Sequence, residues 1–126
     1  MSAMVETIVL REEQARDAAK GLDQFYADFE ETFRGDRELV RKRSEPYLGW
    51  VKDVGAGAED APVLDIGCGR GEWLELLRDS GLHGRGIDLN RVFVDNCRSI
   101  GLDVVVQDAL HGIRALPTAS IGAVTS

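Results

Sequence analysis

The amino-acid sequence predicts an α/β fold built on a doubly wound parallel sheet. Short apolar stretches rich in β-branched residues alternate with helical stretches over the second half of the chain. The connections between them are only a few residues long, which is typical of parallel strands joined by right-handed helical crossovers. A glycine-rich turn also follows the first of these strands, at the place where such sheets bind ligands.

Residues 1–55 are expected to form a helical leader, or cap, that precedes the sheet. Aromatic and leucine side chains recur at three- and four-residue steps over residues 22–33, so they form one stripe along a helix. Gly35 is expected to end this helix, and Asp36 is a good N-cap for a second one. A Gly/Ala-rich link over residues 55–62 then separates the leader from the sheet.

Residues 62–126 are expected to form the sheet-bearing half domain. The strands predicted from short apolar and β-branched runs are Val63–Ile66, Arg85–Asp88, Leu102–Val106 and Ile121–Thr125. Helices are predicted between them over residues 72–80, between Asn90 and Gly101, and around residues 109–116. Asn90 is a good N-cap, and Gly101 is a good stop signal.

The turn after the first predicted strand has glycine at three alternate positions, Gly67, Gly69 and Gly71. Glycine permits positive φ and removes the Cβ atoms that would keep a ligand away from the backbone. The helix that follows directs its free N–H groups into the same space, which suits a carboxylate or a phosphate. The turn is therefore a candidate ligand cradle.

Acidic residues stand at the ends of the next two predicted strands. Asp88 follows the turn by about twenty residues, a position from which a carboxylate can accept both hydroxyls of a ribose. At Asp108 a carboxylate could accept an adenine amino proton, while the next N–H, that of Ala109, donates to a ring nitrogen. The alternative is that the glycines only make a tight turn and the acids only cap helices.

Two classes of adenosine ligand use this geometry. A dinucleotide site needs a third glycine where this chain has Glu72, and a glutamate at the helix start would repel a pyrophosphate. Asp65, just ahead of the first glycine, suits an ammonium group instead. The amino-acid end of S-adenosylmethionine carries both an ammonium and a carboxylate, so this methyl donor is the better fit.

These motifs resemble those of the class I S-adenosylmethionine-dependent methyltransferases. Val63–Glu72 is similar to their glycine-rich motif I, Gly86–Asn90 to their ribose-binding motif and Gln107–Leu110 to their adenine-binding motif. The resemblance covers roughly residues 62–126. It implies a Rossmann-like sheet, of which this chain supplies about four strands, and methyl transfer by in-line displacement at the methyl carbon.

The resemblance also implies a role for each residue of the donor site. Asp65 and the backbone of Gly67 and Gly69 would hold the methionine part, and Asp88 would hold the ribose. Leu89 would pack on the adenine face, and Asp108 with Ala109 would bind the adenine edge. Catalysis would come mostly from aligning donor and acceptor at near-attack distance, with or without a base. These motifs do not identify a catalytic residue on the acceptor side.

The leader has a resemblance of its own. Phe25–Glu30 together with Phe33–Leu39 is similar to the leader of bacterial methyltransferases of lipopolysaccharide O-antigen and other surface-glycan synthesis. Leaders of this kind fold over the donor site, which implies that Tyr26 and Arg34 lie near the donor and that Arg34 pairs with its carboxylate. A surface glycan or a small molecule is then the expected acceptor. For Tyr26 and the phenylalanines of the stripe, plain helix packing is the favoured alternative.

Composition narrows the function classes. The formal net charge of −7 argues against electrostatic binding of nucleic acid, which needs a dense basic surface. Cys68 and Cys97 stand far apart and the histidines are isolated, so no metal site is expected. No apolar stretch approaches the ~20 residues of a membrane span, and the N-terminus lacks a secretion signal, so the cytoplasm is the expected location.

The chain ends at Ser126, at the end of the fourth predicted strand. The open side of that strand, with Ile121 and Val124, is expected to be an unprotected edge that a second copy or a partner chain covers, unless the chain is a fragment of a longer enzyme. Alone, the chain is expected to transfer little or no methyl. Two alternatives stay open: a non-catalytic S-adenosylmethionine-binding or interaction module, and an NAD-binding oxidoreductase domain, which Glu72 disfavours.

Overall fold

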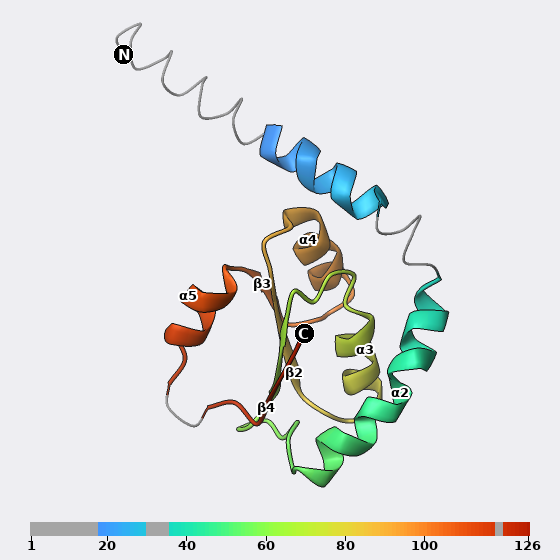
Figure 1. Cartoon of the computed structure of the whole chain (residues 1–126), viewed down its shortest axis with the longest axis vertical. Helices are drawn as coiled ribbons and strands as arrows, with labels where there is room; N and C mark the ends of the chain where they lie inside the picture. Colours follow the sequence, from blue (N-terminus) through green and yellow to red (C-terminus); the bar gives the residue numbers. More distant parts are fainter. Residues whose placement is uncertain (1–17, 30–35, 118–119) are drawn as a thin grey trace, which may run out of the picture.

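The computed structural model describes residues 18–29, 36–117 and 120–126, and within them the predicted α/β fold is confirmed (Figure 1). Residues 18–29 form a helix. The elements that follow are α2 (Arg37–Asp53), β1 (Val63–Ile66), α3 (Glu72–Asp79), β2 (Gly84–Asp88), α4 (Arg91–Ser99), β3 (Val104–Val106), α5 (Ala109–Arg114) and β4 (Ala123–Thr125). None of the helices in the described ranges is long and apolar enough to cross a membrane.

All four strands of the sheet are parallel and lie in the order β3-β2-β1-β4. The chain moves outward from β1 to β3 and then returns to the other side of β1, so the winding reverses beside β1. Ligands bind to open α/β sheets at the carboxyl ends of the strands where this reversal occurs. The register aligns Asp65 of β1 with Gly86 of β2 on one side and with Thr125 of β4 on the other.

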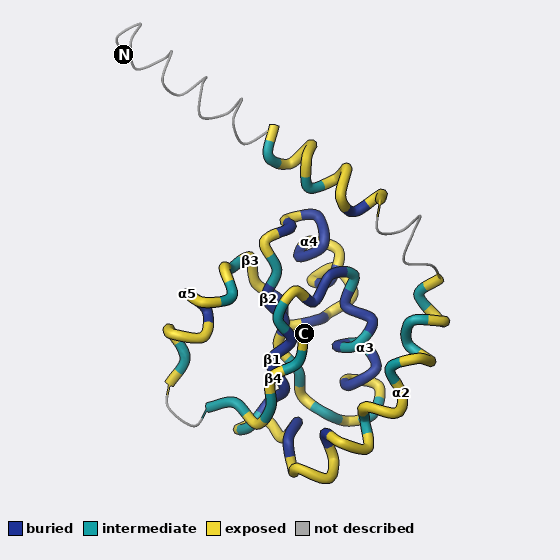
Figure 2. The backbone as a smooth tube through the Cα atoms, viewed as in Figure 1, coloured by how far each residue is buried: buried dark blue, intermediate teal, exposed yellow. Residues whose placement is uncertain are grey.

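Helices cover the two faces of the sheet unequally. α3 and α4 pack on one face and α2 packs on α3, whereas α5 lies on the opposite face beside β2 (Figure 1). The core lies between the sheet and the helices α3 and α4. Figure 2 shows buried backbone, in dark blue, at the centre of the molecule. The most deeply buried apolar side chains of the core are Val63, Leu77, Val94, Cys97 and Val104.

Two of the strands are shorter than the sequence predicted. β3 begins after Leu102, because Gly101 closes α4 with a φ of 84° and the N–H of Leu102 donates to the carbonyl of Cys97 at 3.0 Å. This is the hydrogen bond of a Schellman helix end, so Leu102 belongs to the helix terminus. β4 likewise begins at Ala123 and not at Ile121.

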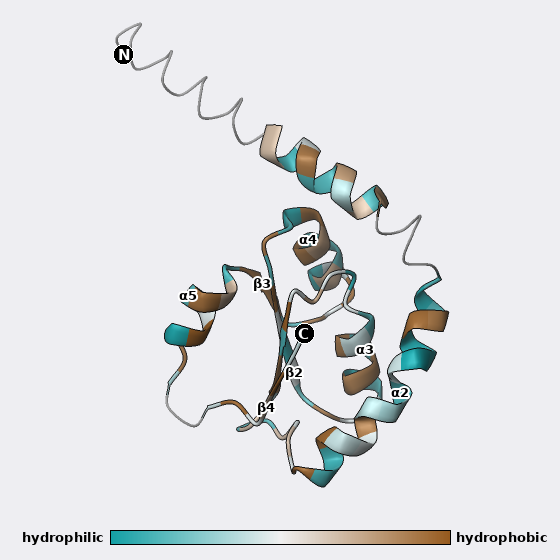
Figure 3. Cartoon of the chain, in the orientation of Figure 1, coloured by the Kyte–Doolittle hydropathy of each residue, from teal (hydrophilic) through white to brown (hydrophobic). Residues whose placement is uncertain are grey.

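The aromatic stripe of the first helix is not packed as expected. The helix over residues 18–29 alternates hydrophobic and hydrophilic residues (Figure 3), and its large apolar side chains are about half exposed: Leu22, Phe25, Tyr26 and Phe29. Only Ala27 is buried on this helix, against Val92 and Phe93 of α4. The periodicity identified the stripe correctly, but the described part of the chain does not cover it.

Polar bonds join this helix to the start of α4. Asn90 caps α4 as predicted, since its Oδ1 accepts from the N–H groups of Val92 and Phe93 at 3.0 and 3.1 Å. The Nδ2 of Asn90 donates to the carbonyl of Asp23 at 2.9 Å. The carboxylate of Asp23 accepts from the N–H of Arg91 at 2.9 Å. The helix therefore docks beside the carboxyl end of β2.

Candidate functional site

The glycine-rich turn joins β1 to α3 at the carboxyl edge of the sheet. Gly67, Gly69 and Gly71 have φ angles of 68°, 55° and 79°, in the left-handed region that their positions predicted. A Cβ on Gly67 would meet no atom within 4 Å, so the backbone there faces open space. A Cβ on Gly71 would lie 2.8 Å from both Cys97 Sγ and Leu102 Cδ1. The turn is therefore open at one end and tightly packed at the other.

Asp88 ends β2 and bonds directly to the turn. Its Oδ2 accepts a hydrogen bond from the N–H of Gly69 at 2.9 Å, and its Oδ1 accepts one from the N–H of Asn90 at 2.8 Å. The structure thus brings together Gly69 and Asp88, which the sequence assigned to one ligand site. Leu89, next in the chain, is 64% exposed and presents an uncovered apolar side chain.

Asp65 lies in β1 with its side chain almost buried and is oriented by the neighbouring strand. Thr125 Oγ1 of β4 donates to Asp65 Oδ1 at 2.8 Å. The same hydroxyl accepts from Trp73 Nε1 of α3 at 3.2 Å. Sequence reasoning missed Thr125 and Trp73, because only the register of β4 against β1 shows that residues 60 positions apart lie together.

Asp108 caps α5, which is the role that the sequence left open as an alternative. Its Oδ2 accepts from the N–H of His111 at 3.2 Å. The end of β3 nevertheless lies beside the end of β2, since the N–H of Gln107 donates to the carbonyl of Asp88 at 3.2 Å. Asp108 is exposed and Ala109 is half-buried. Their contact with an adenine ring stays a prediction.

The predicted leader residues divide into two groups. Arg34 lies outside the described residues, so its contact with a donor carboxylate stays a prediction. Tyr26 is described: it is 54% exposed and meets Phe25 edge to face, with the ring centroids 5.8 Å apart. Its helix reaches the site edge through Asp23, which bonds to Asn90 two residues after Asp88.

The residues around this site match a known family. A family model described as "Methionine biosynthesis protein MetW" matches residues 50–125, which include all four strands and the whole glycine-rich turn. The chain belongs to the MetW family. No curated protein sequence matches it.

A solved structure has the same fold as this MetW-family chain. The crystal structure of an S-adenosylmethionine-dependent methyltransferase from Archaeoglobus fulgidus is 40% identical in sequence, with a TM-score of 0.62. The match covers 74% of this chain and 39% of that chain. The MetW-family chain thus spans about two fifths of the length of that protein and has the Rossmann-like fold of S-adenosylmethionine-dependent methyltransferases.

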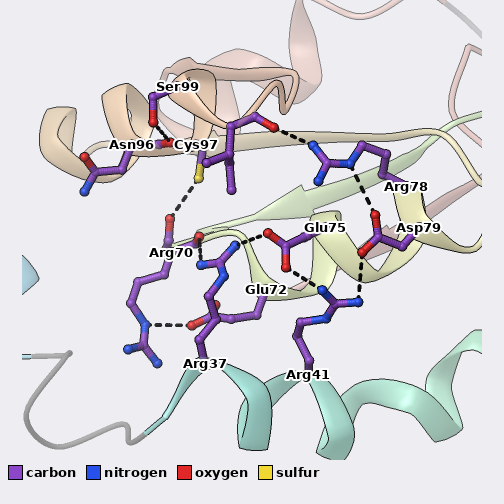
Figure 4. Close-up of polar contacts among 12 residues, drawn as sticks. Arg37, Arg41, Arg70, Glu72, Glu75, Arg78, Asp79, Asn96, Cys97 and Ser99 are labelled. Carbon is purple, nitrogen blue, oxygen red and sulfur yellow. Dashed lines mark hydrogen bonds and ion pairs between the residues drawn. The ribbon is translucent and has the colours of Figure 1, made fainter.

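In this MetW-family chain an ionic cluster ties α2 to α3 beside the turn (Figure 4). Glu75 of α3 accepts from Arg37 at 3.0 Å and from Arg41 at 2.5 Å. Arg41 also pairs with Asp79 at 2.9 Å. Burial acts to raise the pKa of Glu75, but the hydrogen bonds and charges of the two arginines outweigh it and lower the pKa. The cluster therefore stabilises the fold at neutral pH, and this contribution is lost as the pH falls below the usual value of 4.5.

Glu72 does not act as the sequence suggested. Its side chain is 1% exposed, and its Oε1 lies 2.6 Å from Arg70 Nε (Figure 4). This buried ion pair replaces the open carboxylate that was expected to repel a pyrophosphate at the crevice. The predicted preference of the turn for an ammonium group then depends on Asp65, whose carboxylate lies just ahead of the first glycine.

Cys68 and Cys97 lie beneath the turn and are buried, as small apolar residues would be. Cys97 Sγ donates to the carbonyl of Gly69 at 3.4 Å. The contact with Cys97, together with burial, raises the pKa of the Cys68 thiol, which therefore stays protonated. Over the described ranges, no group of His, Cys, Asp and Glu side chains is arranged to hold a metal ion.

Proposed function

We propose that this chain binds S-adenosylmethionine and is the donor-binding half of a methyltransferase. One observation carries the proposal: Asp88 at the end of β2 is hydrogen-bonded to Gly69 in the turn after β1, so two predicted donor-binding elements form one continuous edge. The nearly buried carboxylate of Asp65 stands at the start of the same turn. Likeness to an S-adenosylmethionine-dependent methyltransferase supports the same cofactor.

The polar groups of the turn fit a methionine ammonium better than a phosphate. The N–H of Gly67 donates to the carbonyl of Ile87 at 2.8 Å. The N–H of Gly69 donates to Asp88, so neither N–H is left for a phosphate or a carboxylate. Carbonyl and carboxylate oxygens accept hydrogen bonds from an ammonium group, and the turn offers both kinds. Gly67 also leaves the space in which a ligand could approach the backbone.

Each residue of the predicted site then has a proposed role. Asp65 and the backbone of Gly67 and Gly69 would hold the methionine ammonium, and Arg34 would hold the methionine carboxylate. Asp88 would hold the ribose hydroxyls. Leu89 would pack on the adenine face, and Asp108 with Ala109 would bind the adenine edge. S-adenosylmethionine, when bound, supplies a methyl group on a sulfonium. The chain's own residues bind the two ends of the donor and so orient that methyl toward an acceptor.

The acceptor half of the reaction is proposed from the sequence alone. The leader resemblance favours a surface glycan or a small molecule as the acceptor. The cytoplasm stays the proposed location. None of the side chains assigned here has a role toward the acceptor. We therefore expect little or no methyl transfer by this chain alone, and robust turnover with any glycan or small molecule would contradict that expectation.

Calorimetry with S-adenosylhomocysteine and NAD, titrated in parallel, tests the proposed cofactor. The two ligands share an adenosine but bring different groups to the turn. We expect S-adenosylhomocysteine to bind and NAD to give no heat of binding, because the N–H groups of Gly67 and Gly69 already donate to Ile87 and Asp88. Binding of NAD alone would overturn the proposal in favour of an oxidoreductase domain.

We also propose that the outer edge of β4 pairs with the polypeptide that forms the acceptor half. In the described ranges β4 pairs only with β1. A groove of about 530 Å³ lies beside it, and its exposed apolar lining residues are Tyr47, Trp50, Val54 and Val124. An open strand edge beside apolar surface is a template for a further strand. The match covers 39% of the Archaeoglobus fulgidus methyltransferase, so the unmatched part of that protein is long enough to contain such a strand.

Light scattering of the purified chain tests this choice of occupant. We expect the chain to be a monomer, because the proposed occupant of the β4 edge is the acceptor half and not a second copy of this chain. Val124→Asp tests the β4 edge, and Val105→Asp on β3, at the opposite edge of the sheet, is its control. A dimer that Val124→Asp dissociates and Val105→Asp does not would show that a second copy occupies the edge.

A further inference from the structure

Arg37, at the start of α2, reaches the glycine-rich turn from outside the sheet. Its Nη1 donates to the carbonyl of Arg70 in the turn at 2.7 Å, and its Nη2 bonds to Glu75 Oε2 at 3.0 Å (Figure 4). The planar fork of a guanidinium can make both bonds at once. We propose that Arg37 is a positioning residue for the donor site: it holds the turn in the conformation in which Gly69 meets Asp88. This inference rests on the proposed function.

The turn needs such external bonds because of its composition. Glycine has more backbone conformations to lose on folding than any other residue, and this turn carries glycine at three of five positions. Two of its carbonyl groups are held by side chains: that of Gly69 accepts from Cys97 Sγ and that of Arg70 accepts from Arg37. Asp88 holds the N–H of Gly69 on the other side. Side chains of three separate elements thus select one conformation of the turn.

Glu75 orients Arg37 for this contact. It lies one turn into α3 with a side chain only 16% exposed, so the ion pair is partly shielded from water. Arg41, one turn further along α2, bonds to the same carboxylate and to Asp79, but it makes no bond to the turn. Both arginines therefore bond to Glu75 and differ in their second partner: Arg37 bonds to the Arg70 carbonyl in the turn, whereas Arg41 bonds to Asp79 within α3.

The variants Arg37→Met and Arg41→Met separate positioning from general stability. Both keep the aliphatic length and remove the charge, and both are expected to lower the melting temperature. Only Arg37→Met is expected to weaken S-adenosylhomocysteine binding, by about tenfold, the size of one lost hydrogen bond to a charged donor. Arg41→Met is expected to bind it as the unaltered chain does. Arg37→Lys has an ammonium group that can reach one acceptor but cannot form the fork, so its affinity is expected to lie between that of Arg37→Met and that of the unaltered chain.

Hydrogen exchange without ligand gives a second measure that does not depend on donor binding. We expect the amides of residues 67–71 to exchange faster in Arg37→Met than in the unaltered chain, and to be unchanged in Arg41→Met. Equal exchange and equal affinity in the two variants would overturn the role of Arg37. Failure of the unaltered chain to bind S-adenosylhomocysteine would instead overturn the proposed function, and the exchange rates would still test what holds the turn.

Discussion

Replacing Asp88 with alanine is expected to weaken the binding of S-adenosylhomocysteine roughly a hundredfold. The variant loses the acceptor proposed for the ribose hydroxyls. It also loses the bonds from the N–H groups of Gly69 and Asn90, which hold the turn against the end of β2. Hydrogen bonds to charged groups are worth about 1.5–3 kcal/mol each. The loss of the ligand contacts together with the change in turn geometry is therefore large enough to weaken binding roughly a hundredfold. Calorimetric titration measures the change directly.

A matched acid elsewhere on the sheet provides the control. Asp103 precedes β3 and pairs with Arg85 at 3.1 Å, with both side chains more than half exposed. Exposed ion pairs contribute little to stability, so Asp103→Ala is expected to leave the affinity unchanged. Asp88→Asn, which keeps one acceptor oxygen, is expected to lie between the two. If Asp88→Ala bound S-adenosylhomocysteine as tightly as Asp103→Ala, Asp88 would not belong to the donor site.

Replacing Gly71 with alanine is expected to lower the free energy of unfolding by about 3 kcal/mol. Two costs add at this position. A φ of 79° is disfavoured for any residue with a Cβ, by about 1–2 kcal/mol. The new methyl would also lie 2.8 Å from Cys97 Sγ and Leu102 Cδ1, and overpacking a buried site costs about 1–3 kcal/mol. Urea denaturation followed by tryptophan fluorescence measures the sum.

Gly67→Ala isolates the first of these costs. Its φ of 68° is similar, but its Cβ would meet no atom within 4 Å. We expect a loss of only about 1–2 kcal/mol in the free energy of unfolding. Donor affinity should respond more strongly at this position, because the methyl enters the space left open at the turn. An equal loss of stability in both variants would mean that Gly71 is not packed as tightly as the structure shows.

The fold could be predicted because its signals are local. The glycines at the ends of α3 and α4, the Asn90 cap and the β-branched runs each act within a few residues. The structure has the helix ends, the cap and four strands as expected, although β3 and β4 are shorter than predicted. Strand ends were less certain, because the Schellman end of α4 and the start of β3 compete for Leu102. The exposed stripe of the first helix shows a different limit: periodicity identifies an apolar face but not what covers it.

The sequence predicted the contacts of the candidate site only where the ends of two adjacent strands bring the residues together. Parallel pairing of β1 and β2 is enough to bring Gly69 to Asp88, and sequence order alone predicts that pairing. The bond from Arg37 to Arg70 spans 33 residues between a leader helix and a turn, and no periodic pattern encodes it. Glu72 was misjudged for a related reason, since its neighbour Arg70 neutralises it in a buried ion pair.

The hydroxyl of Thr125 has a consequence for how the chain would respond to a partner. It donates to Asp65, the proposed ligand of the donor ammonium, and it belongs to β4, whose outer edge is unpaired among the residues that the structure describes. A strand that pairs with β4 would order Thr125, and through it the carboxylate proposed to meet the donor. Linkage is reciprocal, so a bound donor would favour that pairing by the same free energy. On this proposal, donor binding and strand pairing at β4 would be two sides of one thermodynamic cycle.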